Sequence, residues 1–314
     1  MRRRVPCLIA AGVAVLVLVL AGCQAMDDAG SPAGDPGRSA ALRVVATTTQ
    51  VADFARNVGG DRVQVTQLLK PNVDPHDYEA SPADVQAIAT ADLVVKNGVG
   101  LEKFLDDAVS SAGFTGTVVD TSAGVKIRAG DEQEPGGDPH IWQDPTNAKI
   151  MVHNIATAFE ASDPAGTAEY RANETGYTAK IDALDARIQT EISGLPVDQR
   201  KLVTNHDAFG YYIARYHLQF LGSILPTDTS AELSGKDIAD LVTKIKAAEV
   251  KAIFAESSLP PKTAEAIGRE AGVTVIEGED ALYGDTLGPP GSAGATYLQM
   301  EQHNTDTIVR ALRG

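Results

Sequence analysis

The chain has 314 residues and a formal charge of −15, with 42 acidic against 27 basic side chains. This acidity argues against nucleic acid as a partner, because phosphate contacts require a basic surface. It suits a cationic ligand, although acidic surfaces often serve only solubility.

The first residues have the features of an export signal. Residues 2–4 are arginines, residues 5–21 are apolar, and Leu-Ala-Gly-Cys stands at residues 20–23, at the end of the apolar run. This pattern predicts a signal peptide over residues 1–22 rather than a membrane span. The junction is similar to a bacterial lipobox, which implies a lipid anchor on Cys23. A plain signal peptide cleaved nearby is the alternative.

Only two cysteines are present, Cys7 and Cys23. Since Cys7 lies in the predicted signal peptide and Cys23 would carry lipid, the mature chain would have no thiol for a disulfide, a nucleophile or a metal site. Removal of the three leader arginines would lower the basic count from 27 to 24 and change the formal charge from −15 to −18. Residues 23–40 are rich in Gly, Pro, Ser, Ala and Asp, which predicts a flexible tether.

An N-terminal α/β lobe is predicted over residues 41–162. Strand patterns cover residues 42–47, 62–69, 92–96 and 117–120, and helical spacing covers residues 50–58, 82–91, 101–112 and 146–161. Strands that alternate with helices at this interval favour a parallel sheet covered on both faces, with ligands beyond the strand ends. The acidic, Gly-rich segment 128–138 is predicted to be flexible.

One long helix is predicted over residues 164–193, within a linking segment 163–195. About 30 helical residues span roughly 45 Å, which suits a rod between two lobes. A helix lying across a single domain is the alternative. A C-terminal α/β lobe is predicted over residues 196–314, with strands at 201–204, 218–221, 251–255 and 273–276 and helices at 208–217, 235–248, 261–271 and 297–312.

Three of the six histidines lie in stiff loops or just after predicted strands. His76 and His140 each follow an Asp-Pro pair, which restrains the backbone on both sides of the proline. His206 lies in Thr-Asn-His-Asp-Ala-Phe, and Asp285 has the comparable position after a strand of the second lobe. A single loop histidine is more often an ordinary hydrogen-bonded residue, but imidazole and carboxylate together suit divalent first-row cations. The other histidines lie on predicted helices and are interpreted as surface or core residues: His153, His217 and His303.

Taken together and in this order, these motifs resemble those of the cluster-nine, ZnuA/TroA-like solute-binding lipoproteins of zinc and manganese ABC importers. The resemblance covers residues 42–312. It implies two pseudo-symmetric lobes, each with a mainly parallel sheet, joined by a rigid helix with the metal between them. It also implies a monomer outside the cytoplasm, anchored to the membrane by its lipid, whose partner is an ABC permease.

Carried over to this sequence, the ligands would be His76 and His140 from the first lobe and His206 and Asp285 from the second. Many manganese members have Glu where this chain has His206, so the resemblance favours Zn²⁺ as the transported ion, with Mn²⁺ less favoured. The acidic segment lacks the histidines of some zinc members, which argues against an accessory capture site. Because metal requires neutral imidazole, binding is expected to weaken below about pH 6.

Several neighbours of these ligands are candidates for supporting roles. Asp77, Asp144 and Asp207 could orient the imidazoles, with turn or helix-cap roles as the alternative. Glu232 is a candidate cleft residue on the basis of the resemblance. Trp142 and Phe209 are expected to pack beside the site, with plain core packing as the alternative.

Two other functions are considered. A zinc hydrolase would need three protein ligands, an exchangeable water and a positioned base, and the sequence contains neither a His-Glu-x-x-His helix nor a nucleophile elbow. We therefore expect a binding protein rather than an enzyme. A surface adhesin of the same family is the remaining alternative.

Overall fold

The structure is a computed structural model that describes residues 41–130, 135–229 and 234–313. The predicted signal peptide, Cys23, the tether and Glu232 lie outside the described residues. Within these ranges no helix combines the length and apolarity needed to cross a membrane. All the described residues fall in one compact unit of the chain.

The first lobe is built on a parallel sheet with strand order β2-β1-β3-β4. Val44 on the central strand lies opposite Val65 on one neighbour and Leu93 on the other. Apolar side chains are buried on both faces, as in parallel sheets covered by helices. The strands are β1 (Leu42–Ala46), β2 (Val63–Gln67), β3 (Leu93–Lys96) and β4 (Thr117–Asp120).

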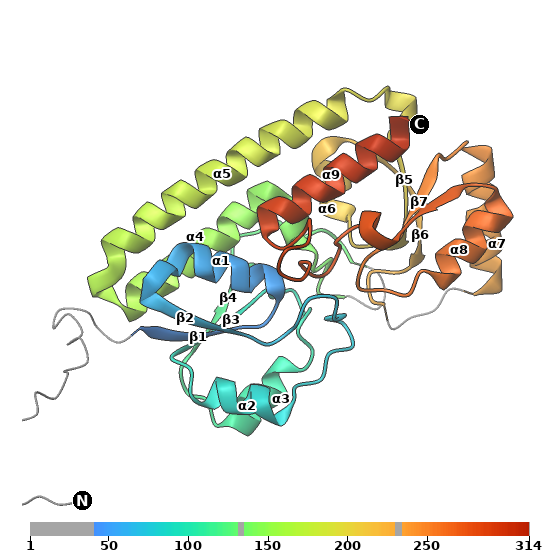
Figure 1. Cartoon of the computed structure of the whole chain (residues 1–314). Coiled ribbons are helices and arrows are strands. Elements are labelled where there is room, and N and C mark those ends of the chain that lie inside the picture. Colours follow the sequence, from blue (N-terminus) through green and yellow to red (C-terminus); the bar gives the residue numbers. More distant parts are fainter. Residues whose placement is uncertain (1–40, 131–134, 230–233, 314) are drawn as a thin grey trace, which may run out of the picture. The chain divides into compact units, whose positions relative to one another are not determined.

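Two pairs of helices cover this sheet. The first pair, α1 (Thr49–Gly59) and α4 (Pro145–Ser162), packs on one face, and the second pair, α2 (Pro82–Ala89) and α3 (Leu105–Ala112), packs on the other (Figure 1). Short 3₁₀ turns lie at Gly60–Arg62 and Ile141–Gln143. Ser81 begins α2 with a capping box, as Ser-Pro predicts.

The prediction that a helix begins at residue 101 was wrong. Three consecutive residues before that point have positive φ, with 94° at Gly98, 58° at Val99 and 81° at Gly100. Glu102 then turns inward, where its carboxylate accepts hydrogen bonds from Thr47 Oγ1 at 2.6 Å and from two backbone N–H groups. The helix begins only at Leu105, because this buried acid uses a non-helical backbone.

The long helix is α5 (Thr167–Ser193), which follows a 3₁₀ turn at Pro164–Gly166. Its 27 residues span roughly 40 Å. The helix packs against α1 and α4 of the first lobe and against α6 and α9 of the second, as Figure 1 shows. The predicted rod between two lobes is confirmed. Its buried residues recur every three to four positions: Tyr170, Tyr177, Ile181, Leu184, Ile188 and Ile192.

The second lobe repeats the plan of the first. Its sheet is also parallel, with order β6-β5-β7-β8, so in both sheets the first strand of the lobe lies between the second and third. The strands are β5 (Lys201–His206), β6 (Gln219–Leu225), β7 (Ala252–Phe254) and β8 (Thr274–Ile276). The helices are α6 (Gly210–Tyr216), α7 (Gly235–Ala247), α8 (Lys262–Ala271) and α9 (Tyr297–Arg313), with 3₁₀ turns at Val197–Gln199 and Gly278–Asp280.

The apolar core is continuous between the lobes. One buried cluster includes Phe54 and Trp142 from the first lobe together with Tyr212 and Tyr297 from the second. The rings of Phe54 and Tyr297 meet edge to face, with centroids 4.9 Å apart. This shared core supports the loops at the strand ends of both sheets. The residue boundaries predicted for the lobes stay a prediction.

Candidate metal centre

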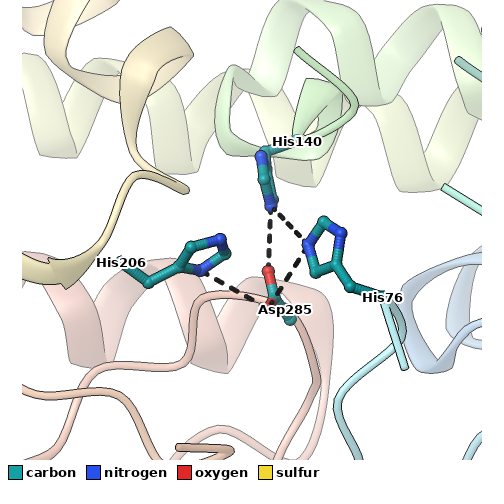
Figure 2. Close-up of side chains that lie close together, drawn as sticks. All are labelled: His76, His140, His206 and Asp285. Carbon is teal, nitrogen blue, oxygen red and sulfur yellow. Dashed lines mark hydrogen bonds and ion pairs between the residues drawn. The ribbon is translucent and has the colours of Figure 1, made fainter. Parts of the chain in front are cut away.

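The four side chains selected from the sequence lie together and are buried (Figure 2). Their potential donor atoms all lie within 4.8 Å of one another. His140 Nε2 lies 3.3 Å from His76 Nε2 and 3.1 Å from Asp285 Oδ1, and His206 Nδ1 lies 3.5 Å from Asp285 Oδ2. Three imidazole nitrogens and one carboxylate at this spacing can surround a divalent ion.

His140 is oriented by the acid of its own motif. Asp138 Oδ1 accepts hydrogen bonds from the backbone N–H and from Nδ1 of His140, at 3.0 and 2.9 Å. Nε2 is therefore the ring atom that faces the cluster, an arrangement common to histidines that bind metals. The Trp142 ring lies 5.4 Å away, between centroids, and shields the imidazole. Trp142 confirms the predicted packing role, whereas the nearest aromatic partner of buried Phe209 is Tyr212.

His76 follows the same local pattern in the loop after β2. Its backbone N–H donates to Asp74 Oδ1 at 2.9 Å, so each Asp-Pro-His motif closes an Asx-type turn around its proline. Asp74 Oδ2 also accepts a hydrogen bond from Thr229 Oγ1 of the second lobe, at 2.7 Å. The turn therefore fixes the histidine and contacts the other lobe.

The prediction of flexibility over residues 128–138 was wrong at both ends of the segment. The Asp138 backbone N–H donates to the Arg128 carbonyl at 3.1 Å. The Tyr211 hydroxyl accepts from the Arg128 N–H at 2.9 Å and donates to the Asp138 carbonyl at 3.0 Å. Residues 131–134 lie outside the described chain. The ends fold because Asp138 belongs to the histidine motif as well as to the acidic segment.

His206 is held by the second lobe. It is the last residue of β5, and its Nε2–H donates to the Thr227 carbonyl at 3.0 Å. Nδ1 consequently faces the cluster, where it lies 3.3 Å from Glu256 Oε1. Glu256 is not predicted from the sequence, because an acid in an Ala-Glu-Ser-Ser segment gives no signal for such a position.

Asp285 lies in a loop that connects both lobes. Before it, Leu282 forms a parallel bridge with Glu256 of the second lobe. The next carbonyls face the first lobe, since Gly284 O accepts from Trp142 Nε1 at 3.0 Å and Asp285 O accepts from Gln50 Nε2 at 2.9 Å. Asp285, predicted as a ligand from the second lobe, is therefore also held by the first. Two further bonds to the first lobe join Leu287 N to Thr49 Oγ1 and Asn72 N to Thr286 Oγ1.

The cluster perturbs the pKa of each of its members. Burial lowers the pKa of His76 to about 3. Burial acts in the same direction on His206, but the charges of Asp285 and Glu256 outweigh it and raise the pKa to about 9. The pKa of His140 is also raised, because Asp138 and Asp285 outweigh its burial. The three imidazoles overcome the effect of burial on Asp285 and lower its pKa. Without metal, the cluster therefore stores protons on His140 and His206 beside an ionised Asp285.

The acids proposed to orient the imidazoles have other surroundings. Asp77 is exposed. Asp144 caps α4, accepting the Thr146 N–H at 2.8 Å, which is the alternative role considered for it. Asp207 is half-buried and does not provide the side-chain cap of α6. Within the described residues, the carboxylates that contact the imidazole rings from outside the four-residue cluster are Asp138 on His140, Glu256 on His206 and Glu174 on His153.

The remaining histidines lie away from the cluster, as predicted. His153 is exposed on α4 and pairs with Glu174 at 2.8 Å. His217 is exposed at the end of α6, and His303 bonds the Ala281 carbonyl at 3.0 Å. The four-residue cluster is thus formed selectively by the loop and strand-end histidines.

A buried cluster of nitrogen and oxygen donors, set between two parallel-sheet lobes joined by a long helix, defines a metal-binding solute-binding protein. Residues 44–311 match the family model ZnuA, zinc-uptake complex component A, periplasmic, and the chain belongs to this family.

Relatives within the family carry the names of different metals. The manganese-binding lipoprotein MntA of Bacillus subtilis is 33% identical over 309 residues, covering 96% of this chain and 98% of its own length. The zinc-binding protein TroA of Treponema pallidum is 33% identical over 275 residues, covering 86% of this chain and 88% of its own. The family is shared, and the metal differs between relatives.

Solved structures confirm the fold. The periplasmic zinc-binding protein TroA of Treponema pallidum superposes with a TM-score of 0.80 at 32% identity, covering 87% of this chain and 99% of that chain. The Mn-bound periplasmic metal-binding protein of Candidatus Liberibacter asiaticus has a TM-score of 0.78 at 26% identity, covering 86% and 99%. The two-lobed α/β architecture is that of metal-binding solute-binding proteins.

Proposed function

We propose that this chain is the extracytoplasmic solute-binding component of an ABC metal importer, which captures Zn²⁺ with His76, His140, His206 and Asp285 and delivers it to a permease. One observation carries the proposal: four buried donors from distant parts of the chain lie within 4.8 Å of one another. Family membership supports the transport role.

The donor set favours zinc over manganese. Zinc binds imidazole nitrogen and carboxylate oxygen in four-coordinate sites, whereas manganese prefers sites richer in oxygen. Three imidazoles and one carboxylate match the first preference. Relatives named for zinc and for manganese show that the family framework serves both ions.

Capture requires proton displacement. The lone pairs of His140 and His206 must be free before they can bind an ion, and in the metal-free protein the pKa of each ring is raised. The incoming cation replaces these positive charges beside Asp285. The same exchange in reverse would assist release, because protons compete directly with the metal.

The site supports binding without chemical turnover. Four protein donors complete the tetrahedral shell of zinc, whereas a catalytic zinc site leaves a position open for water or substrate. The family is one of solute-binding proteins, and relatives named as components of metal ABC transporters favour transport over the adhesin alternative.

The location and the assembly of the chain form part of the same proposal. Export through the signal at residues 1–22 and a lipid on Cys23 would hold a monomer at the outer face of the cell membrane, beside the permease. Relatives named as lipoproteins support this anchoring.

Metal analysis of the purified protein tests the proposal. Protein prepared without chelator should contain about one zinc per chain, and Zn²⁺ should displace Mn²⁺ in competition. His140→Ala should lose the metal, whereas the matched control His153→Ala, an exposed histidine, should keep it. Retention of zinc by His140→Ala would show that the ion binds elsewhere.

A further inference from the structure

Glu256 is a buried acid fastened next to a proposed ligand. Its residue is 2% exposed and follows β7 by two positions. Its backbone N–H donates to Asn205 Oδ1 at 3.1 Å, and Asn205 immediately precedes His206. This bond aligns the two strand ends, and the Glu256 carboxylate reaches the cluster, with Oε1 3.3 Å from His206 Nδ1.

The His206 ring is a partner of the Glu256 carboxylate. Oε1 lies 3.3 Å from His206 Nδ1, but neither oxygen forms a hydrogen bond of good geometry with the described residues, although both are shielded from solvent. Among the other buried acids, Glu102 accepts bonds from Thr47 Oγ1 and from the N–H groups of Asn97 and Gly98, whereas neither oxygen of Glu301 on α9 forms a hydrogen bond with the described residues. What distinguishes Glu256 is its contact with a proposed ligand, and buried charges are either paired or coordinate metals.

Gly284 provides the space that this carboxylate occupies. A Cβ at Gly284 would lie 1.7 Å from Glu256 Oε2, so a larger residue and this carboxylate position are incompatible. Gly284 immediately precedes Asp285, and its carbonyl is fixed by Trp142 and Gln143. The carboxylate therefore lies between the His206 ring and the backbone that carries Asp285.

Metal binding changes the contacts of the Glu256 carboxylate. An ion on His206 Nδ1 occupies the ring atom nearest to the carboxylate and leaves Glu256 without that partner. At the same time, a divalent ion held by neutral imidazoles and by Asp285 keeps an uncompensated positive charge in a buried site. If the Glu256 carboxylate binds the ion, it gains a new partner and compensates the positive charge.

We propose that Glu256 is a fifth donor of the metal centre. Its carboxylate binds Mn²⁺ and other ions that take more than four ligands and prefer oxygen, and it remains outside the ligand shell of Zn²⁺. The inference rests on the proposed function of the four-residue cluster. It makes Glu256 a specificity-determining residue, because the number of available oxygens sets how well the site accepts manganese.

Replacement of the acid by its amide is expected to affect the binding of Mn²⁺ and of Zn²⁺ differently. Glu256→Gln should weaken Mn²⁺ binding by more than about 100-fold, beyond the range for residues that only support a ligand, and should weaken Zn²⁺ binding less, within that range or below it. Affinities are measured by competition with a chromophoric chelator. The matched control is Glu277→Gln. Glu277 is an exposed acid that directly follows β8, and its replacement should change neither affinity. Equal effects on both ions, or none, would overturn the inference.

Crystals of the wild-type protein give a test that does not depend on how the variant folds. Anomalous scattering from Mn²⁺ should locate the ion within bonding distance of Glu256, and crystals with Zn²⁺ should show the carboxylate outside the shell. A manganese ion bound without Glu256 would overturn the inference. Failure of the proposed function looks different, because the wild type would then bind neither ion at the cluster or His140→Ala would keep both.

Discussion

His140 and His206 occupy the same buried cluster but are held in different ways. In the first lobe, a carboxylate fixes His140 through Nδ1, and Asp138 closes the turn around it. In the second lobe, a backbone carbonyl fixes His206 through Nε2, and the carboxylate of the neighbouring Glu256 makes no hydrogen bond of good geometry within the described chain. The acid beside His140 is hydrogen-bonded to its ring, whereas the acid beside His206 has no well-formed hydrogen bond to either carboxylate oxygen.

The attachment of Asp285 extends this difference. Its loop bonds to Gln50 and Trp142 of the first lobe through two backbone carbonyls. Two donors, His76 and His140, are therefore fastened to the first lobe and His206 to the second, while Asp285 lies in a loop bonded to both. The comparison indicates that separation of the lobes would take His206 away from His76 and His140.

The largest expected effect comes from removing the donor of the second lobe. His206→Ala should lower Zn²⁺ affinity by more than about 100-fold, beyond the range for residues that only support a ligand, because the ion then loses the donor that the second lobe alone holds. Chelator competition measures the affinity, and stopped-flow mixing measures the dissociation rate. His217→Ala, exposed on the same lobe, is the control. Slow zinc release from His206→Ala would contradict a separate role for the donor held by the second lobe.

A smaller loss should follow from weakening the support of His140. Asp138→Asn removes the charge that orients the ring and should lower Zn²⁺ affinity by about 10–100-fold. Asp144→Asn is the matched control, since Asp144 caps α4 and contacts no imidazole of the cluster. Titration calorimetry compares the two variants. Equal affinities in both would show that the Asp138 contact has no role in binding.

The proton count on binding tests the charges around the two rings. Because His206 has a pKa of about 9 and the pKa of His140 is also raised, both rings carry protons at neutral pH, and one ion should release about two protons. Protons compete with metal, so affinity should fall steadily as the pH is lowered from about 9 to 5.5. Calorimetry in buffers of different ionisation enthalpy measures the release. Constant affinity between pH 7.5 and 5.5 would contradict direct histidine ligation.

The proton count also revises an expectation from the sequence. An onset of weakening near pH 6 assumes an ordinary imidazole, whereas the negative charges around His206 raise its pKa to about 9. Those charges come from Asp285 and Glu256, which are distant from His206 in the sequence. Single-residue chemistry therefore predicted the direction of the pH effect, but its range depends on tertiary contacts.

Local patterns predicted most of the fold. Tyr170, Tyr177 and Ile181 recur at helical spacing and identified α5, because the period of a buried stripe is visible without knowing its partner. The same reasoning failed at Glu102, where a buried acid turns the chain inward before α3 begins. The inward turn depends on the hydrogen bond from Thr47, which is 55 residues away in the sequence and is therefore not visible in the local pattern.

The candidate site was predictable where its residues lie in distinctive motifs. His76 and His140 each follow Asp-Pro, and the structure shows the aspartate of each motif accepting the histidine N–H. Glu256 was missed because its position beside His206 arises from the pairing of β5 with β7. The attachment of the Asp285 loop to Gln50 was missed for the same reason.

The absence of sulfur from the donor set has a practical consequence. Both cysteines of the chain precede residue 24, and the cluster consists of imidazole and carboxylate groups. Oxidants convert thiolate ligands to sulfenic and higher acids, whereas imidazole and carboxylate do not undergo this oxidation. Peroxide or disulfide-forming surroundings should therefore leave the cluster able to bind its ion, and no reductant is needed to keep it intact.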